Sequence, residues 1–471
     1  MNGAALTVKE KIGYGMGDAG CNMIGGAIML FLNYFYTDVF GLAPALVGVL
    51  LLSVRVLDAV TDPIMGAIAD RSRSRWGRFR PWLLWISLPY VLFSVMMFTT
   101  PDWSYDNKVI YAFVTYFLMS LTYTAINIPY CSLGGVMTND PGERVSCQSY
   151  RFVMVGIATL ILSLSLLPLA EWFGGADKAR GYQMAMSVLA LIGLFMFLFC
   201  FATVRERIQP AVPSHDDLKA DLRDVWKNDQ WVRILLLTLC NVCPGFIRMA
   251  ATMYYVTWVM QQSSQFATLF ISLGVIGMMI GSTLAKVLTD RWCKLKVFFW
   301  TNIALAAFSG GFYFLDPQAT ILILVMYFLL NILHQIPSPL HWSLMADVDD
   351  YGEWKTGKRT TGISFSGNLF FLKVGLAVAG AMVGFLLSWY GYDAAAKQQS
   401  PSALNGIVLL FTAIPALGYL MTAAVVRLLK VDRQLMQLIQ NDLQQRRANY
   451  QELNDYQHSK ALNTQSQGEI P

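Results

Sequence analysis

Residues 182–204 read YQMAMSVLALIGLFMFLFCFATV, a stretch that contains no charged side chain. A helix needs about 20 mostly apolar residues to cross the hydrocarbon core of a bilayer. Only helices and closed barrels satisfy every backbone hydrogen bond in lipid, and one long apolar stretch favours the helix. The stretch therefore predicts a membrane-spanning helix.

The rest of the chain repeats this pattern. Of its 471 residues, 55% are hydrophobic and 14% are charged, whereas soluble domains carry about 25% charged residues. This composition excludes an ordinary soluble enzyme and predicts an all-α integral membrane protein with twelve transmembrane helices. The twelve predicted segments are 13–36, 44–69, 82–100, 109–137, 149–170, 182–204, 232–260, 265–289, 296–315, 318–346, 362–390 and 402–428.

Lysine and arginine are distributed unevenly between the two sides of the membrane that these segments define. Of the 35 such residues, 26 fall in the termini and loops of one side, 4 on the other side and 5 at membrane depth. Cytoplasmic loops carry the excess of positive charge, so we expect both termini in the cytoplasm. The first segment contains Asp18 and lacks a small-residue cleavage site, so we retain it as a span.

A basic loop indicates an internal repeat. Residues 70–80 read DRSRSRWGRFR after the second segment, and residues 290–296 read DRWCKLK after the eighth. This echo predicts two pseudo-symmetric six-helix bundles, an arrangement common among transporters. The expected domains are an N-terminal bundle at 1–204, a central loop at 205–231, a C-terminal bundle at 232–428 and a polar tail at 429–471.

The two polar connections are expected to differ in structure. In the central loop, Ser214 and Asp217 form a capping pair ahead of the apolar residues Leu218 and Leu222. This pattern predicts a short amphipathic helix at the cytoplasmic surface. The tail contains too little apolar surface to fold alone, and we assign it no function.

The sequence indicates neither a cofactor nor a nucleic-acid partner. Cys240 and Cys243 have a metal-like spacing, but no second cysteine or histidine pair flanks them, and core filling is favoured. The net charge of +5 is spread over loops without a basic stripe interleaved with aromatic residues. We expect no enzyme activity, no cofactor and no obligate protein partner, with the bilayer and a small molecule as the partners.

Charged residues inside the predicted spans indicate a functional cavity. Each costs about 2.5–3.5 kcal/mol at a lipid-facing midplane. Lys286 reaches a nearby helix end, but the others must pair or face a hydrated cavity, because together they would cost on the order of 20 kcal/mol. They are Asp18, Arg55, Asp58, Asp62, Arg151, Arg248 and Lys373.

Three of these charges share one face of the second span. Arg55, Asp58 and Asp62 are spaced i, i+3 and i+7. Two carboxylates beside one arginine leave one negative charge unpaired. A Na⁺ would balance it through oxygen ligands, to which Thr61 adds a hydroxyl, or one carboxylate would take a proton. The alternative is a buried ion network that only fixes helix packing.

Polar side chains on other spans extend the candidate cavity. Asp18 and Asn22 share a face of the first span, and Thr124, Asn127 and Cys131 share a face of the fourth. Both faces are expected to line the cavity, and Asp18 is a candidate substrate-binding residue.

The tenth span carries a continuous polar stripe. Its members both donate and accept hydrogen bonds, as the recognition of hydroxylated ligands requires. An ordinary helix contact is the alternative, since polar groups also join transmembrane helices. The stripe consists of Asn331, His334, Gln335, Ser338, His341 and Trp342, of which His334 is a candidate substrate-binding residue.

Longer motifs resemble those of the glycoside-pentoside-hexuronide:cation symporters, the family of the melibiose carrier. The run RVLDAVTDPIMG at 55–66 continues to SRWGRFRPW at 74–82. The resemblance covers about residues 8–430. Further motifs that agree are NIPY at 127–130, KNDQ at 227–230 and DYGE at 350–353, with Arg359 and Lys373 following.

This resemblance implies a major-facilitator fold that couples inward sugar movement to Na⁺, Li⁺ or H⁺. Asp58 and Asp62 match the family's cation carboxylates, and Thr124 matches a threonine near that site. The positions that match residues at or near the sugar site are Asn22, Asn127, Cys131, Arg151 and Lys373.

Four positions depart from the melibiose carrier. Asn22 and Asn127 replace aspartates, and Cys131 replaces a tryptophan, which argues against melibiose as the substrate. Thr61 stands where that carrier has an asparagine tied to Na⁺ use, so proton coupling is at least as favoured. The resemblance is greatest to enteric bacterial members associated with xylosides or other pentosides.

We therefore expect a secondary active symporter of the bacterial inner membrane. It would import a glycoside or oligosaccharide, such as a xyloside or other pentoside, by alternating access with H⁺ or Na⁺. The alternatives are an exporter of sugars or drugs on the same fold and a membrane sugar sensor that does not transport.

Overall fold

The structure is a computed structural model that describes residues 5–175, 177–208, 223–393, 396, 398–446 and 448. Every predicted apolar segment is helical in this part of the chain. The N-terminal bundle consists of α1 (Val8–Tyr34) with the π-helical turn η1 (Phe35–Val39), α2 (Pro44–Arg71), α3 (Arg80–Met97), α4 (Tyr105–Val136), α5 (Pro141–Gly174) and α6 (Lys178–Thr203).

The C-terminal bundle contains more helices because two of its spans are broken. Its helices are α8 (Asp229–Tyr254) with the π-helical turn η2 (Tyr255–Val259), α9 (Ser264–Arg291), α10 (Lys294–Gly311) with the short 3₁₀ turn η3 (Phe312–Phe314), α11 (Thr320–Gln335), α12 (Pro337–Thr356), α13 (Thr361–Trp389), α14 (Pro401–Phe411) and α15 (Ala413–Val426). Proline has no N–H, so Pro337 cannot donate to the carbonyl of Leu333, and α11 ends just before it. Pro415 likewise separates α15 from α14.

The expected fold of twelve transmembrane helices is confirmed. Ten helical spans of the described residues are long and apolar enough to cross a membrane. The other two predicted segments form α1 and α2, which are 27 and 28 residues long. Their lengths also reach across a bilayer, because a helix rises about 1.5 Å per residue.

The two bundles repeat one another in detail. The π-helical turn after α1 has a counterpart after α8, and each turn is five residues long. The next helices, α2 and α9, each contain 28 residues, and the helices that follow, α3 and α10, each contain 18. The echo of the basic loops therefore reflects a repeat of the backbone.

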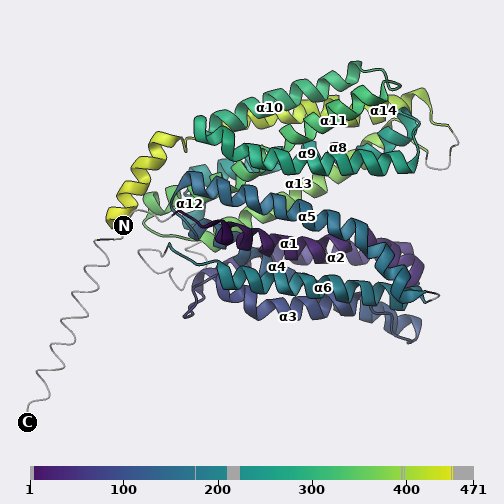
Figure 1. The fold of residues 1–471 in the computed structure, drawn as a ribbon, viewed down its shortest axis with the longest axis horizontal. Coiled ribbons are helices and arrows are strands. Elements are labelled where there is room, and N and C mark those ends of the chain that lie inside the picture. The colour runs from purple at the N-terminus through teal and green to yellow at the C-terminus, as the bar shows by residue number, and fades with distance from the viewer. Residues whose placement is uncertain are drawn as a thin grey trace, which may run out of the picture.

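The bundles lie side by side, with the start of α1 and a helix at 433–446 at the same end of the long helices (Figure 1). Across the boundary, α5 packs against α9 and α2 packs against α13. An even number of spans returns the chain to its starting side, in keeping with this placement.

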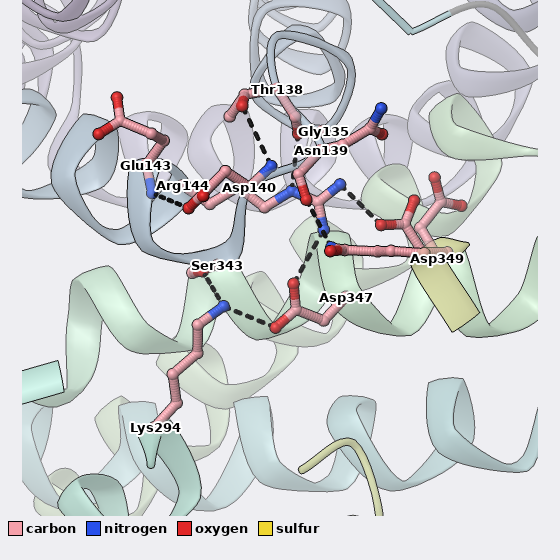
Figure 2. A network of polar contacts seen from close by, with 12 residues as sticks. Gly135, Thr138, Asn139, Asp140, Glu143, Arg144, Lys294, Ser343, Asp347 and Asp349 are labelled. Atoms are coloured by element: carbon pink, nitrogen blue, oxygen red, sulfur yellow. Dashed lines mark hydrogen bonds and ion pairs between the residues drawn. The ribbon is translucent and has the colours of Figure 1, made fainter. Parts of the chain in front are cut away.

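Buried ion pairs join the bundles at that end, which we call the closed end. The guanidinium of Arg144 on α5 lies 2.8 Å from Oδ1 of Asp347 on α12 (Figure 2). It also lies 2.7 Å from Oδ2 of Asp350 on the same helix. Lys294 of α10 contacts Oδ2 of Asp347 at 2.6 Å and donates to the Ser343 hydroxyl. Arg144, Asp347 and Asp350 are almost completely buried, so these contacts exclude water from the closed end.

Two further contacts cross the closed end. Arg359 pairs with Asp350 and Glu353, and its Nη2 donates to the carbonyl of Gly135 on α4 at 3.0 Å. Asp70 at the end of α2 accepts hydrogen bonds of 2.8 and 3.0 Å from the amides of Gly362 and Ile363, in the first turn of α13. A carboxylate is well placed there because the first turn leaves its N–H groups unpaired.

The backbones of α2 and α13 approach closely at the same end. A Cβ atom at Gly66 would lie 2.6 Å from the Gly362 carbonyl oxygen, closer than atoms of this kind pack. Small residues at such crossings let helix backbones touch.

Gly66→Val should therefore destabilise this state by about 1–3 kcal/mol, the usual cost of forcing extra volume into a packed site. The matched control is Gly48→Val on the same helix, where an added Cβ meets nothing within 4 Å. Thermal unfolding of the purified variants in detergent is the measurement, and only Gly66→Val should lower the midpoint. Equal midpoints would show that this helix crossing tolerates a side chain.

The polar connections differ from the transmembrane part. The predicted capping pair Ser214 and Asp217 lies outside the described residues. The described end of the central loop is helical over 223–226. In the tail, residues 433–446 form a helix whose Met436, Ile439 and Leu443 are buried. This part of the tail gains its apolar contacts by packing on the bundles.

Candidate cation and sugar site

The two carboxylates of α2 bind a lysine from the opposite bundle. Asp58 lies at the middle of α2, and Asp62 lies one turn further along. The ammonium of Lys373 on α13 is 3.1 Å from Asp58 Oδ2 and 2.8 Å from Asp62 Oδ2. Lys373 therefore connects the two bundles through both carboxylates.

Helix α4 supplies two hydroxyl groups to the same cluster. Ser120 donates to Asp58 Oδ1 at 2.6 Å, and Thr124 donates to Asp62 Oδ1 at 3.1 Å. The two donors are one helical turn apart, as are the two acceptors, so the faces of α2 and α4 match in register. The cluster of Asp58, Asp62, Ser120, Thr124 and Lys373 is called the carboxylate cluster below.

The carboxylate cluster is buried. Asp58 is 3% exposed and Asp62 is 1% exposed, whereas the Lys373 side chain is 19% exposed. Within the cluster, two carboxylates face one ammonium, and burying charge without compensation is costly. A small monovalent cation or a proton that binds either carboxylate would compete with Lys373 for it.

Thr61, which was expected in the cation site, has different surroundings. The hydroxyl of Thr61 donates to the carbonyl of Leu57 on its own helix at 3.1 Å, so it is not directed to either carboxylate. The side chain of Arg55 lies outside the described residues.

A second polar group surrounds Arg151 on α5. The Arg151 guanidinium is 2.7 Å from Asp18 Oδ2 on α1 and donates to Gln148 at 3.2 Å. The Asn22 amide donates to the side chain of Asp18 at 3.2 Å. Asp18 and Arg151 are buried, whereas Asn22 is half-buried.

The same group extends to α4 and to the opposite bundle. Cys131 lies 3.8 Å from Arg151 Nη2 and from Asn127 Oδ1. Asn127 also donates to the Tyr123 hydroxyl at 3.4 Å. The Arg151 guanidinium stacks over the ring of Trp342, 4.4 Å from its centroid. Five expected sugar-site residues thus lie together: Asp18, Asn22, Asn127, Cys131 and Arg151.

The polar stripe expected on the tenth span continues past the helix break before Pro337. Asn331 and His334 of α11 and Ser338 of α12 line one cavity. Further along α12 the stripe residues have different neighbours. His341 contacts Thr238 and Asn368 inside its own bundle, whereas Trp342 contacts Arg151.

His334 lies apart from the polar group around Arg151. It lines a cavity of about 270 Å³ within the C-terminal bundle, together with Arg248 and Asn331. Arg248 donates to the Ser309 hydroxyl at 3.1 Å and stacks over the ring of Tyr419. The structure therefore places His334 in a second polar region.

Sequence reasoning missed Ser120 and Gln148 as site residues, and it placed Trp342 in the polar stripe without its contact to Arg151. Ser120 lies four residues before Thr124, so the periodicity of α4 was a usable signal. Gln148 lies three residues before Arg151 on α5, which is also a usable spacing. The role of Trp342 depends on how the two bundles pack, and periodicity within one helix does not report on that.

The fold and this site define a class of protein: a membrane transporter whose two six-helix bundles meet at buried charged and polar side chains. The sequence profile described as "MFS/sugar transport protein" matches residues 13–433. The chain belongs to this family, as the motifs indicated, and it is a multi-pass membrane transporter rather than an enzyme.

Two relatives with curated names are similar over most of their length. "Inner membrane symporter YicJ" of Escherichia coli strain K12 is 46% identical over 427 residues, which cover 91% of this chain and 92% of that protein. The "Isoprimeverose transporter" of Lactiplantibacillus pentosus is 32% identical and covers 95% of this chain and 94% of its own.

Solved structures support the fold. The fucose:proton symporter FucP of E. coli has a TM-score of 0.66 at 11% identity, covering 89% of this chain and 97% of that chain. A bacterial homologue of the iron transporter ferroportin, in an outward-facing state, has a TM-score of 0.64 at 13% identity, covering 90% and 99%. At these identities the likeness concerns the fold alone.

Proposed function

We propose that the protein is a sugar–cation symporter that imports a glycoside or oligosaccharide, such as a xyloside or other pentoside, with H⁺ or Na⁺. The observation that carries this proposal is the carboxylate cluster, in which Asp58 and Asp62 of one bundle bind Lys373 of the other. Relatives named as a symporter and as an isoprimeverose transporter support the same function.

Cation binding and sugar binding are coupled because the cation and Lys373 compete for the carboxylates of Asp58 and Asp62. A proton or Na⁺ that binds Asp58 or Asp62 weakens the attraction of that carboxylate for Lys373. The ammonium of Lys373 is then available to a sugar hydroxyl, and it is the most exposed charge in the cluster. Cation binding thus favours sugar binding, and sugar binding favours the cation by the same factor.

In this proposal, the polar side chains around Arg151 bind the sugar. Asn22 and Asn127 both donate and accept hydrogen bonds, which suits sugar hydroxyls. Trp342 offers an aromatic face, and its contact with Arg151 places that face at the boundary between the bundles. A sugar bound there touches both bundles, so its binding is coupled to their relative movement.

Orientation decides which state the structure represents. We place the protein in the bacterial inner membrane with both termini in the cytoplasm, as the distribution of lysine and arginine favours. The closed end is then cytoplasmic, and the ion pairs of Arg144 hold the state that is closed to the cytoplasm. Import requires these ion pairs to separate in each cycle.

The membrane potential supplies enough energy for uptake. One positive charge that moves inward through 100 mV contributes about 2.3 kcal/mol, which supports roughly fiftyfold accumulation before any ion gradient is counted.

The test is the pH of the medium around de-energised cells that express the protein. Xylosides, galactosides and glucuronides are added in turn, with and without Na⁺. Alkalinisation by one sugar class supports proton symport, and Na⁺-stimulated sugar entry without alkalinisation supports sodium symport. Acidification would indicate efflux by antiport and would contradict the proposal, as would the absence of sugar entry in every arm. Asp106→Asn, at an exposed position on α4, is the matched control for later variants.

A further inference from the structure

A strongly basic cavity lies at the closed end of the N-terminal bundle, remote from the carboxylate cluster. It has a volume of about 550 Å³ and lies between the loop that joins α2 to α3 and the residues that follow α6. Five arginines line it: Arg73, Arg75, Arg78, Arg80 and Arg205.

The acidic residue that lines this cavity is held by the backbone of the loop. The Glu206 carboxylate accepts hydrogen bonds from the amides of Arg78, Phe79 and Arg80 at 2.8–2.9 Å. Gly77 permits this close approach, with φ at +116° and no side chain to meet the carboxylate. Glu206 thus shapes the loop, and its single charge offsets only one of the five arginines.

The arginines themselves have few anionic partners. Arg80 donates to the Phe201 carbonyl at 2.7 Å, and Arg75 stacks over the ring of Trp76. Within the described residues, no carboxylate forms an ion pair with any of the five. Burial lowers the pKa of the Arg78 guanidinium, and the charge of Arg73 lowers it further, although Asp70 and Glu206 oppose this effect. Among the described residues, the positive charges that line the cavity therefore outnumber the negative ones.

Apolar side chains are exposed beside the cavity. Ile68 lies four residues before Ser72 on α2, and Trp85 lies five residues after Arg80 on α3, and each is 46% exposed. These residues belong to membrane-spanning helices, so their exposed faces meet acyl chains. An occupant that is anionic at one end and apolar at the other fits both features.

We propose that this cavity binds the phosphate headgroup of an acidic membrane phospholipid of the inner leaflet. The proposal uses the orientation given above, in which this end of the bundle is cytoplasmic. Clustered arginines bind phosphate well because each guanidinium presents several N–H donors in a fixed plane. Basic cavities on the cytoplasmic side of membrane proteins are suited to such headgroups.

The position of the cavity links it to the closed end. The loop begins directly after the helix end that carries Asp70, whose carboxylate holds the first turn of α13. A bound phosphate would reduce the mutual repulsion of the arginines and would thereby stabilise the loop between α2 and α3. Acidic lipid therefore favours the state closed to the cytoplasm.

The experiment measures lipid binding to the purified full-length protein by native mass spectrometry, without sugar. The probes are phosphatidylglycerol, phosphatidylethanolamine and inorganic phosphate. The test variant is Arg73→Gln with Arg205→Gln. The matched control is Arg291→Gln with Lys296→Gln, which removes two exposed charges from the equivalent loop of the other bundle. All proteins must elute as single symmetric peaks before titration.

Phosphatidylglycerol should bind the test variant about thirtyfold more weakly than the wild type, since each basic residue contributes about a factor of five. The control should change by less than about twofold, because neither of its two charges lines the cavity. Equal loss in both variants, or equal binding of the two lipids, would overturn the proposal. Inorganic phosphate that binds as tightly as phosphatidylglycerol would make this a free-anion site and overturn it too. Because no sugar is present, none of these results depends on the transport function.

Discussion

Asp62→Asn should reduce ion-driven sugar accumulation from about fiftyfold to about equal concentrations on the two sides at 100 mV. Asp62 is 1% exposed and binds both Lys373 and Thr124, so it is a central member of the carboxylate cluster. With Asn at this position, the cluster loses one of the two carboxylates for which a coupling cation and Lys373 compete. Asparagine also keeps the shape of the side chain, so packing should change little.

Two readouts separate lost coupling from lost folding. Steady-state accumulation reports coupling, whereas exchange of internal for external sugar at equal concentrations reports sugar binding and movement. The variant should lose accumulation and retain exchange, while Asp106→Asn should retain both. Full accumulation by Asp62→Asn would place the coupling cation elsewhere.

Arg144→Gln should open the closed end. Arg144 is the N-terminal bundle's partner for Asp347 and Asp350, and all three side chains are about 1% exposed. Arg144→Gln removes the charged contacts of α5 with both carboxylates, although Lys294 and Arg359 still pair with Asp347 and Asp350. A hydrogen bond to a charged group contributes about 1.5–3 kcal/mol. Losing these contacts destabilises the state closed to the cytoplasm and shifts its equilibrium with the open state by more than about tenfold.

A distance between spin labels measures this shift. Lys9 at the start of α1 and Lys296 at the start of α10 are exposed and lie at the closed end of opposite bundles. Labels at these positions should move apart in Arg144→Gln and keep the wild-type distance in Arg180→Gln, an exposed arginine at the other end of its bundle. An unchanged distance in Arg144→Gln would mean that these ion pairs do not hold the bundles together.

The transmembrane helices could be predicted because hydropathy is a local property. Each apolar segment had to be helical in lipid, and the loops at 70–80 and 290–296 revealed the repeat. The closed end was not predictable in this way. Arg144 pairs with Asp347, which lies 203 residues away. Arg144 lies in the first turn of α5 and Asp347 directly follows the predicted tenth segment, and charge is ordinary at both places.

The sequence predicted which face of a helix carries the site residues, but it did not predict which residues of other helices they contact. The spacing of Asp58 and Asp62 placed both on one side of α2, and the structure shows one lysine bound to both. The same spacing did not show that Lys373 belongs to that cluster, since its position depends on how α13 packs against α2. Thr61 illustrates a second limit, because a threonine in a helix satisfies its hydroxyl on the preceding turn.

The measurement that tests the central claim most directly is the number of cations that enter with each sugar. Purified protein in proteoliposomes is given a fixed sugar gradient, and the membrane potential at which net sugar flux stops is determined with H⁺ or Na⁺ as the available cation. For the wild type, we expect a membrane potential that stops net sugar flux, because positive charge enters with the sugar. For Asp62→Asn, we expect the membrane potential to have no effect on net sugar flux. A wild-type sugar flux that does not change with the membrane potential or with either cation gradient would contradict the account.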